Sequence, residues 1–81
     1  MDIKVVFGQN LRRLRREKGL SQEELAHRAG CARAYLSGAE AGRRNATIET
    51  IEALAAVLEI HPSDLIRSPP LDQKVGKDRP M

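Results

Sequence analysis

The sequence predicts an all-α protein, a compact five-helix bundle with a flexible C-terminal tail. Its apolar residues are mostly aliphatic, with one Phe, one Tyr and no Trp among 81 residues, which suits packed helices better than a sheet. Apolar positions recur every three or four residues along much of the chain, which is the helical period. Glycines and capping residues separate these periodic segments. We therefore expect one domain over residues 1–66 and a tail over 67–81.

The first helix is expected over residues 2–18. Its apolar residues lie at helical spacing, at Ile3, Phe7, Leu11 and Leu14. Gly19 follows, and glycine suits the left-handed backbone that ends many helices. Basic residues crowd the last turn, where they face the negative end of the helix dipole. Pattern, end signal and charge therefore agree on one long helix.

A second and a third helix are expected over residues 22–29 and 32–40. Ser21 and Glu24 have the spacing of a capping box, in which each side chain binds a free backbone N–H of the first turn. Gly30 supplies the tight turn between the two helices. A capped helix, a tight turn and another helix make up a helix-turn-helix, whose second helix can enter the major groove of DNA.

Two further helices are expected in the C-terminal half. Residues 42–45 form a basic loop, and Thr47 is a good N-cap for a fourth helix. The apolar stripe of that helix consists of Ile48, Ile51, Leu54, Ala55 and Leu58. Pro62 suits the first position of a short fifth helix, and we expect His61 to cap it. Beyond residue 66, two adjacent prolines, a glycine and few large apolar groups predict the flexible tail.

Charge is unevenly distributed along the chain. The net charge is +3, but residues 1–45 hold ten Lys and Arg against five Asp and Glu. Residues 46–66 hold four acidic residues and neither Lys nor Arg. A surface that faces phosphates favours such segregation, with the acidic segment turned away from them. Taken alone, the charge pattern also fits arginines that merely solvate a helix.

Size and composition argue against catalysis, metal binding and membrane insertion. The chain is too short for a buried enzymatic cleft plus a second domain, and it has no evident nucleophile–base pair or glycine-rich phosphate loop. Glu23 and His27 are spaced like metal ligands but lack a third, so a solvated helix face is the better interpretation and no cofactor is expected. We interpret the single cysteine, Cys31, as a packed thiol, with a redox switch as the alternative. A lone cysteine, the absence of a visible signal peptide and the absence of a long apolar run predict a cytoplasmic protein without membrane contact.

Two segments of the chain resemble the Cro/C1-type (XRE) family of helix-turn-helix regulators: LRRLRREKGLSQEELAHRAGCARAYLSGAEAGRRN and TIETIEALAAVLEIHPSDLI. The resemblance covers about residues 5–66. The family contains phage repressors, restriction–modification controller proteins and antitoxin repressors, and a small chain without an evident ligand-sensing domain fits each class. The resemblance implies a lambda-repressor-like domain that binds a pseudo-palindromic double-stranded DNA operator as a homodimer.

The resemblance implies DNA contacts at Gln22, Arg33, Ala34, Tyr35, Ser37, Arg43, Arg44 and Asn45. An arginine in the first turn of the recognition helix, as Arg33 is, either pairs with a guanine edge, which we favour, or contacts a phosphate. Gln22 is expected at a phosphate or base and the loop arginines at phosphates, with a solvated surface as the alternative. Tyr35 contacts DNA, packs on the second helix, or does both. Ala34 and Gly38 occupy positions that often carry polar side chains, so DNA bending is expected to add specificity.

The expected dimer interface consists of the outward residues of the fourth helix together with Ile60, Leu65 and Ile66, because the fourth helix carries more apolar surface than one small core needs. Two-fold pairing doubles the DNA site and places the recognition helices about 34 Å apart. The alternative function is a protein-binding adaptor or antitoxin that uses the same fold to bind a protein partner. Affinity that falls steeply with salt separates DNA binding from that alternative.

Overall fold

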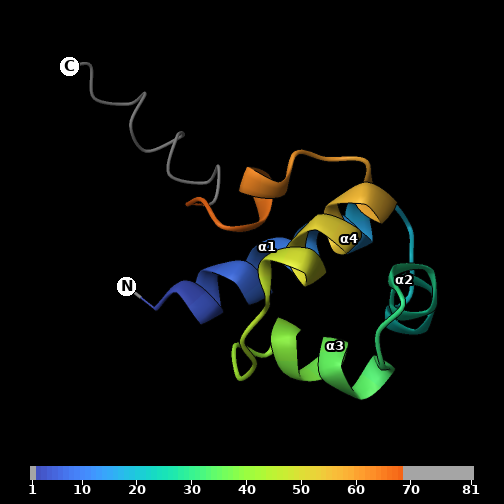
Figure 1. The fold of residues 1–81 in the computed structure, drawn as a ribbon, viewed down its shortest axis with the longest axis horizontal. Helices are drawn as coiled ribbons and strands as arrows, with labels where there is room; N and C mark the ends of the chain where they lie inside the picture. Colours follow the sequence, from blue (N-terminus) through green and yellow to red (C-terminus); the bar gives the residue numbers. More distant parts are fainter. Residues whose placement is uncertain (1, 69–81) are drawn as a thin grey trace.

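Four α-helices and one short 3₁₀ helix make up the part of the chain that the computed structural model describes, residues 2–68 (Figure 1). The elements in chain order are α1 (Ile3–Glu17), α2 (Gln22–Ala29), α3 (Arg33–Glu40), α4 (Ile48–Leu58) and the 3₁₀ helix η1 (Pro62–Leu65). No strand occurs among these residues, so the all-α prediction is confirmed. Most of the predicted tail, from residue 69 onward, lies outside the described residues.

Local sequence accounts for where the helices begin. The Glu24 N–H donates to Ser21 Oγ at 3.0 Å and the Ser21 N–H donates to Glu24 Oε1 at 3.1 Å, so the predicted capping box of α2 is confirmed. Thr47 caps α4 by accepting a hydrogen bond from the Thr50 N–H at 3.0 Å. Ala32 is the N-cap of α3 and makes no side-chain hydrogen bond. The start of α3 therefore depends more on packing than the starts of α2 and α4 do.

The predicted short fifth helix is present as one turn of 3₁₀ helix, so the described residues contain four α-helices and not five. His61 does cap the turn as expected, through Nδ1 and a reciprocal bond between its N–H and Asp64 Oδ2 at 3.2 Å. Asn10 of α1 is fully buried and donates to the carbonyls of Leu65 at 3.1 Å and Arg67 at 2.7 Å. These two bonds fasten the end of η1 and the residues after it to α1.

One core joins all five elements. Its largest apolar side chains without exposed surface are those of Leu11, Leu25, Leu36, Leu54, Leu58 and Leu65. In this core α1 contacts α3 and η1, while α2 contacts α3 and α4. The predicted stripe of α4 is confirmed at Leu54, Ala55 and Leu58 but is wrong at Ile48, which is 83% exposed. Ile48 is the first residue of α4, and the core packs against the turns that follow it.

The backbones of α1 and α3 approach closely at Gly8. A Cβ atom on Gly8 would overlap the carbonyl oxygen of Ala39 and lie 2.9 Å from that of Glu40. Both carbonyls belong to the last turn of α3. A side chain at this position would therefore push the end of α3 away from α1.

Candidate nucleic-acid interface

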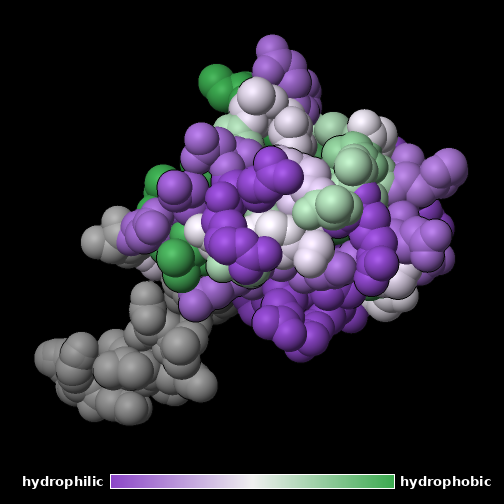
Figure 2. Space-filling view, turned by 90° about the horizontal axis from the view of Figure 1, so that it is seen from below, coloured by the Kyte–Doolittle hydropathy of each residue, from purple (hydrophilic) through white to green (hydrophobic). Residues whose placement is uncertain are grey.

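The outer face of α3 consists of three exposed residues at helical spacing, Arg33, Ala34 and Ser37, and continues at the exposed C-cap residue Ala41. Leu36 and Ala39 lie on the opposite side of the helix and are fully buried. Seen from the side on which α3 lies, the molecule has a largely hydrophilic surface with paler, less polar residues between the charged ones (Figure 2). Three of the predicted contact residues therefore share one accessible face.

The loop after α3 folds back along one border of this outer face. The Arg44 guanidinium lies over the Tyr35 ring, with Cζ 5.7 Å from the ring centroid, in a cation–π arrangement. The Tyr35 hydroxyl donates to the backbone carbonyl of Asn45 at 2.7 Å. Burial raises the pKa of this hydroxyl, so it stays protonated as a donor at neutral pH. Tyr35 thus packs on the protein and positions the basic loop.

Gly38 lies beneath Arg44 and does not belong to the outer face. A Cβ atom on Gly38 would lie 2.9 Å from Arg44 Cγ. The position where the resemblance implies a polar side chain is therefore covered here by the Arg44 side chain. Arg43 is exposed, and its backbone N–H donates to the Gly38 carbonyl at 2.9 Å, which ties the loop to α3 a second time.

Gln22, at the start of α2, is held by the end of α3. Its Nε2 donates to Glu40 Oε1 at 3.0 Å. Glu40 also pairs with Arg15 of α1, whose Nε lies 2.6 Å from Oε2 and whose Nη2 lies 3.0 Å from Oε1. The remaining Nη1 of Arg15 donates to the Leu20 carbonyl at 2.8 Å. Gln22 is therefore oriented by an ion pair, and is not a freely solvated first-turn side chain.

This ion pair is almost buried, with the Arg15 side chain 11% and the Glu40 side chain 5% exposed. Burial disfavours the Glu40 carboxylate, but the hydrogen bonds from Arg15 and Gln22 outweigh it and lower the pKa of Glu40. The same hydrogen bond raises the pKa of Arg15. Both groups stay charged at neutral pH and join α1, α2 and α3. Arg15 and Glu40 both lie within the segment that carries the family resemblance, but nothing in the sequence shows that they pair with each other.

Arg12 and Arg16 of α1 lie beside the same cluster, although the sequence does not single them out. Both are exposed, and they line a shallow pocket of about 240 Å³ together with Gln22, Ser37 and Ala41. Their signal in the sequence is only an i, i+4 spacing within a basic helix, which any solvated helix can carry.

The three residues predicted for a dimer interface have different environments. Leu65 is fully buried in the core of this chain, so including it in the interface is wrong. Ile60 is half-buried and lines a hollow with Leu14 and Leu58. Ile66 is 42% exposed and lines a different hollow, next to Ile3. The accessible apolar candidates are therefore Ile60 and Ile66.

The remaining candidate groups have ordinary surroundings. Glu23 and His27 are exposed on α2. Cys31 packs against the core, which confirms the packed thiol, and burial raises its pKa. Within residues 2–68, no three or more His, Cys, Asp or Glu side chains are grouped so that they could hold a metal ion. No helix in this range has the length and apolar character needed to cross a membrane.

The chain is similar to proteins named as transcriptional regulators, and the helix-turn-helix family model matches residues 11–65. The HTH-type regulator y4dJ of Sinorhizobium fredii is 47% identical over 66 residues, which cover 82% of this chain and 86% of that protein. The structure of the restriction-modification controller protein C.AhdI from Aeromonas hydrophila is 50% identical, with a TM-score of 0.74 over 76% of this chain and 94% of that one. SinR, a master regulator for biofilm formation solved in complex with DNA, is 39% identical, with a TM-score of 0.73 over 75% of this chain and 98% of that one. By sequence and by fold, this chain belongs to the Cro/C1-type (XRE) helix-turn-helix family.

Proposed function

We propose that the protein is a sequence-specific regulator of transcription that binds double-stranded DNA with α3 in the major groove. The observation that carries this proposal is the outer face of α3, where Arg33, Ala34 and Ser37 are exposed together beside Arg44. The major groove of B-DNA admits one α-helix, and phosphates line both of its edges. A short exposed helix with a basic border has the shape and charge for that position.

Arg33 carries the base recognition in this proposal. An arginine in the first turn of a recognition helix can donate to both N7 and O6 of guanine, which is worth about 1–3 kcal/mol of discrimination. Ser37 offers a hydroxyl to a base edge or phosphate, and Ala34 offers a methyl group to a thymine methyl. Few polar groups face the bases, so bending of the operator contributes to specificity.

The remaining predicted residues contact phosphates. Arg43, Arg44 and Asn45 lie in the loop that Tyr35 ties to α3, so their positions follow the recognition helix. Gln22 uses Nε2 for its bond to Glu40, and that nitrogen has a second hydrogen for a phosphate oxygen. These contacts fix the register of the protein on DNA without specifying sequence.

The proposed complex is a homodimer on a pseudo-palindromic operator. One helix-turn-helix contacts few base pairs, and pairing through Ile60 and Ile66 doubles the site with recognition helices about 34 Å apart. The similar proteins are named as regulators and not as enzymes, and we propose no catalytic activity. We expect the protein to act in the cytoplasm, where the DNA of bacteria lies.

Selection of bound sequences from a random duplex pool tests this function. We expect a two-fold related pair of half-sites, one DNA turn apart, with affinity for the selected duplex that falls steeply as salt rises. Enrichment of no sequence, together with affinity for duplex DNA that is independent of salt, would contradict the proposal and favour the protein-binding adaptor.

A further inference from the structure

We propose that Arg12 and Arg16 of α1 form a second phosphate-binding border, on the opposite side of the outer face of α3 from Arg44. This inference rests on the proposed DNA-binding function and adds a part of the interface that the helix-turn-helix itself does not contain. The two arginines are one helical turn apart, so their side chains leave the same face of α1. Both are exposed.

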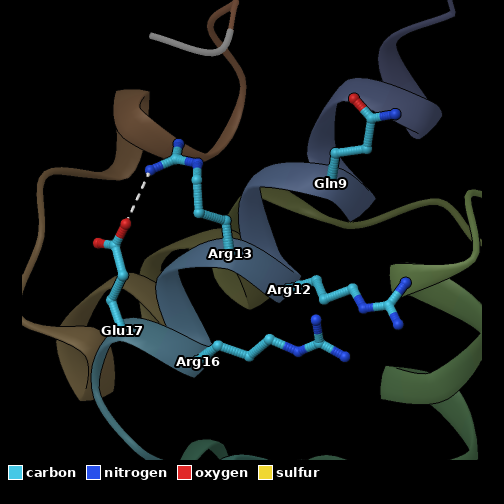
Figure 3. A pocket seen from close by; sticks show the side chains of 5 residues that line it. All are labelled: Gln9, Arg12, Arg13, Arg16 and Glu17. Atoms are coloured by element: carbon cyan, nitrogen blue, oxygen red, sulfur yellow. Dashed lines mark ion pairs between the residues drawn. The ribbon is translucent and has the colours of Figure 1, made fainter. Parts of the chain in front are cut away.

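The direction of these side chains sets them apart from the other arginines of α1. Figure 3 shows Arg12 and Arg16 extending together toward α3, whereas Arg13 points the other way, toward Glu17. Arg13 Nη1 lies 3.6 Å from a Glu17 oxygen, and Arg15 is committed to Glu40. Among residues 2–68, neither Arg12 nor Arg16 lies within 4.0 Å of an acidic oxygen as an ion pair. Their charges are therefore available to a ligand.

The residues next to each group of arginines show which border of the outer face that group occupies. Arg44 lies over Tyr35 and Gly38, which are three residues apart on one side of α3. Arg12 and Arg16 line the pocket that contains Ser37, Glu40 and Ala41, on the other side. Because a recognition helix in the major groove has a sugar–phosphate strand along each side, arginines on both borders contact different strands.

The local charge also favours an anionic ligand. The pocket beside α3 is lined by three arginines and one glutamate, so its net charge is positive even though Glu40 is ionised. Burial and the hydrogen bonds from Arg15 and Gln22 have the largest effects on the pKa of Glu40, and the charge of Arg12 lowers it further. Arg12 lines the same pocket as Gln22 and Glu40, so it can act on the same phosphate region as Gln22.

Salt titration of the Arg12→Ala/Arg16→Ala double variant on the selected operator duplex tests this inference. Each lost phosphate contact lowers the slope of log affinity against log salt by about 0.9, so we expect the double variant to lose about 1.8. The preferred sequence stays the same, because phosphate contacts do not specify bases. Arg12→Lys/Arg16→Lys retains the charge and keeps most of the slope. Arg13→Ala is the matched control and leaves the slope unchanged.

Operator duplexes in which one phosphate at a time is replaced by a neutral methylphosphonate show which DNA strand each group of arginines contacts. Replacing a phosphate should weaken binding of the wild type at two groups of phosphates in each half-site. In the double variant, replacement should no longer weaken binding at one of these groups, and in Arg44→Ala it should no longer do so at the other. Arg16→Ala alone, which leaves in place the charge of Arg12 that acts on Glu40, guards against an indirect effect, and circular dichroism verifies folding. Slopes equal to wild type in the double variant, with the wild type still binding its operator, overturn this inference alone. A wild type without specific, salt-dependent binding overturns the proposed function instead.

Discussion

Arg15 and Glu40, 25 residues apart in the sequence, form a bidentate ion pair between the C-terminal half of α1 and the end of α3. Gln22 completes the cluster from the start of α2. One carboxylate therefore fixes three helices relative to one another, and two of them make up the helix-turn-helix. The orientation of the outer face of α3 depends on this contact as well as on the core.

Glu40→Gln should destabilise the fold by about 2–3 kcal/mol at neutral pH, because it leaves the nearly buried Arg15 guanidinium without its counter-charge. The folded-state pKa of Glu40 lies below its usual 4.5, so its contribution is present above that pH and is lost as the pH falls through the lower folded value. Urea unfolding at a series of pH values should give a smaller acid-induced loss in the variant than in wild type. Glu49→Gln, an exposed change on α4, is the control; equal stability of the two variants at pH 7 would contradict the role of Glu40.

Gly8→Ala should destabilise the protein by about 1–3 kcal/mol, although alanine is the better helix former by about 1 kcal/mol. The added methyl group overlaps the Ala39 carbonyl oxygen, so α1 and α3 must separate. Thermal unfolding measures the change, and DNA affinity should fall because the end of α3 moves. Gln9→Ala, on the exposed side of the same helix, should have little effect on stability. An unchanged melting temperature for Gly8→Ala would show that the helices adjust without strain.

Arg33→Ala should change the sequence preference of DNA binding, whereas Arg43→Ala should change its overall affinity. Loss of Arg33 removes the guanine contact and relaxes the preference at one base pair per half-site, by about 1–3 kcal/mol. Loss of Arg43 weakens binding to all duplexes alike and reduces the salt dependence. Affinities for a panel of single-base operator variants distinguish the two effects. If the panel keeps its ranking in Arg33→Ala, Arg33 contacts a phosphate and not a base.

Ile66→Asp should weaken dimerisation at least about tenfold, since it places a charge in the proposed apolar interface, and tenfold corresponds to about 1.4 kcal/mol. Sedimentation at several concentrations gives the dimerisation constant. Val5→Asp is the matched control, because Val5 on α1 is exposed to almost the same extent as Ile66 and lies outside the proposed interface. If neither Ile66→Asp nor Ile60→Asp changes the constant, the dimer uses another surface.

Interactions between near neighbours in the chain could be predicted well. The capping box at Ser21, the cap at His61 and the left-handed turn at Gly30 are all present as expected. Each depends on side chains and backbone groups within a few residues, so spacing alone identifies them. The same holds for the buried Leu11, Leu54 and Leu58, because helical period selects them.

Features that depend on which helix faces which could not be predicted in this way. Whether Leu65 belongs to the core or to an interface depends on how η1 packs against α1, where Asn10 binds its last carbonyl. Gly38 is covered because the Arg44 side chain folds over it. A pattern of residue types predicts neither the burial of Leu65 against α1 nor the covering of Gly38 by Arg44.

By itself, the sequence determined the helical elements, their caps, the identity of most core residues and the helix-turn-helix family to which the chain belongs. Only the tertiary structure decided how the charged groups are used. It pairs Arg15 with Glu40, leaves Arg12 and Arg16 free among the described residues, and turns Arg13 away. The physical reason is that helix caps act within one turn, whereas an ion pair depends on the distance between residues brought together by packing. Four arginines that look alike in the run LRRLRRE thereby acquire three different roles.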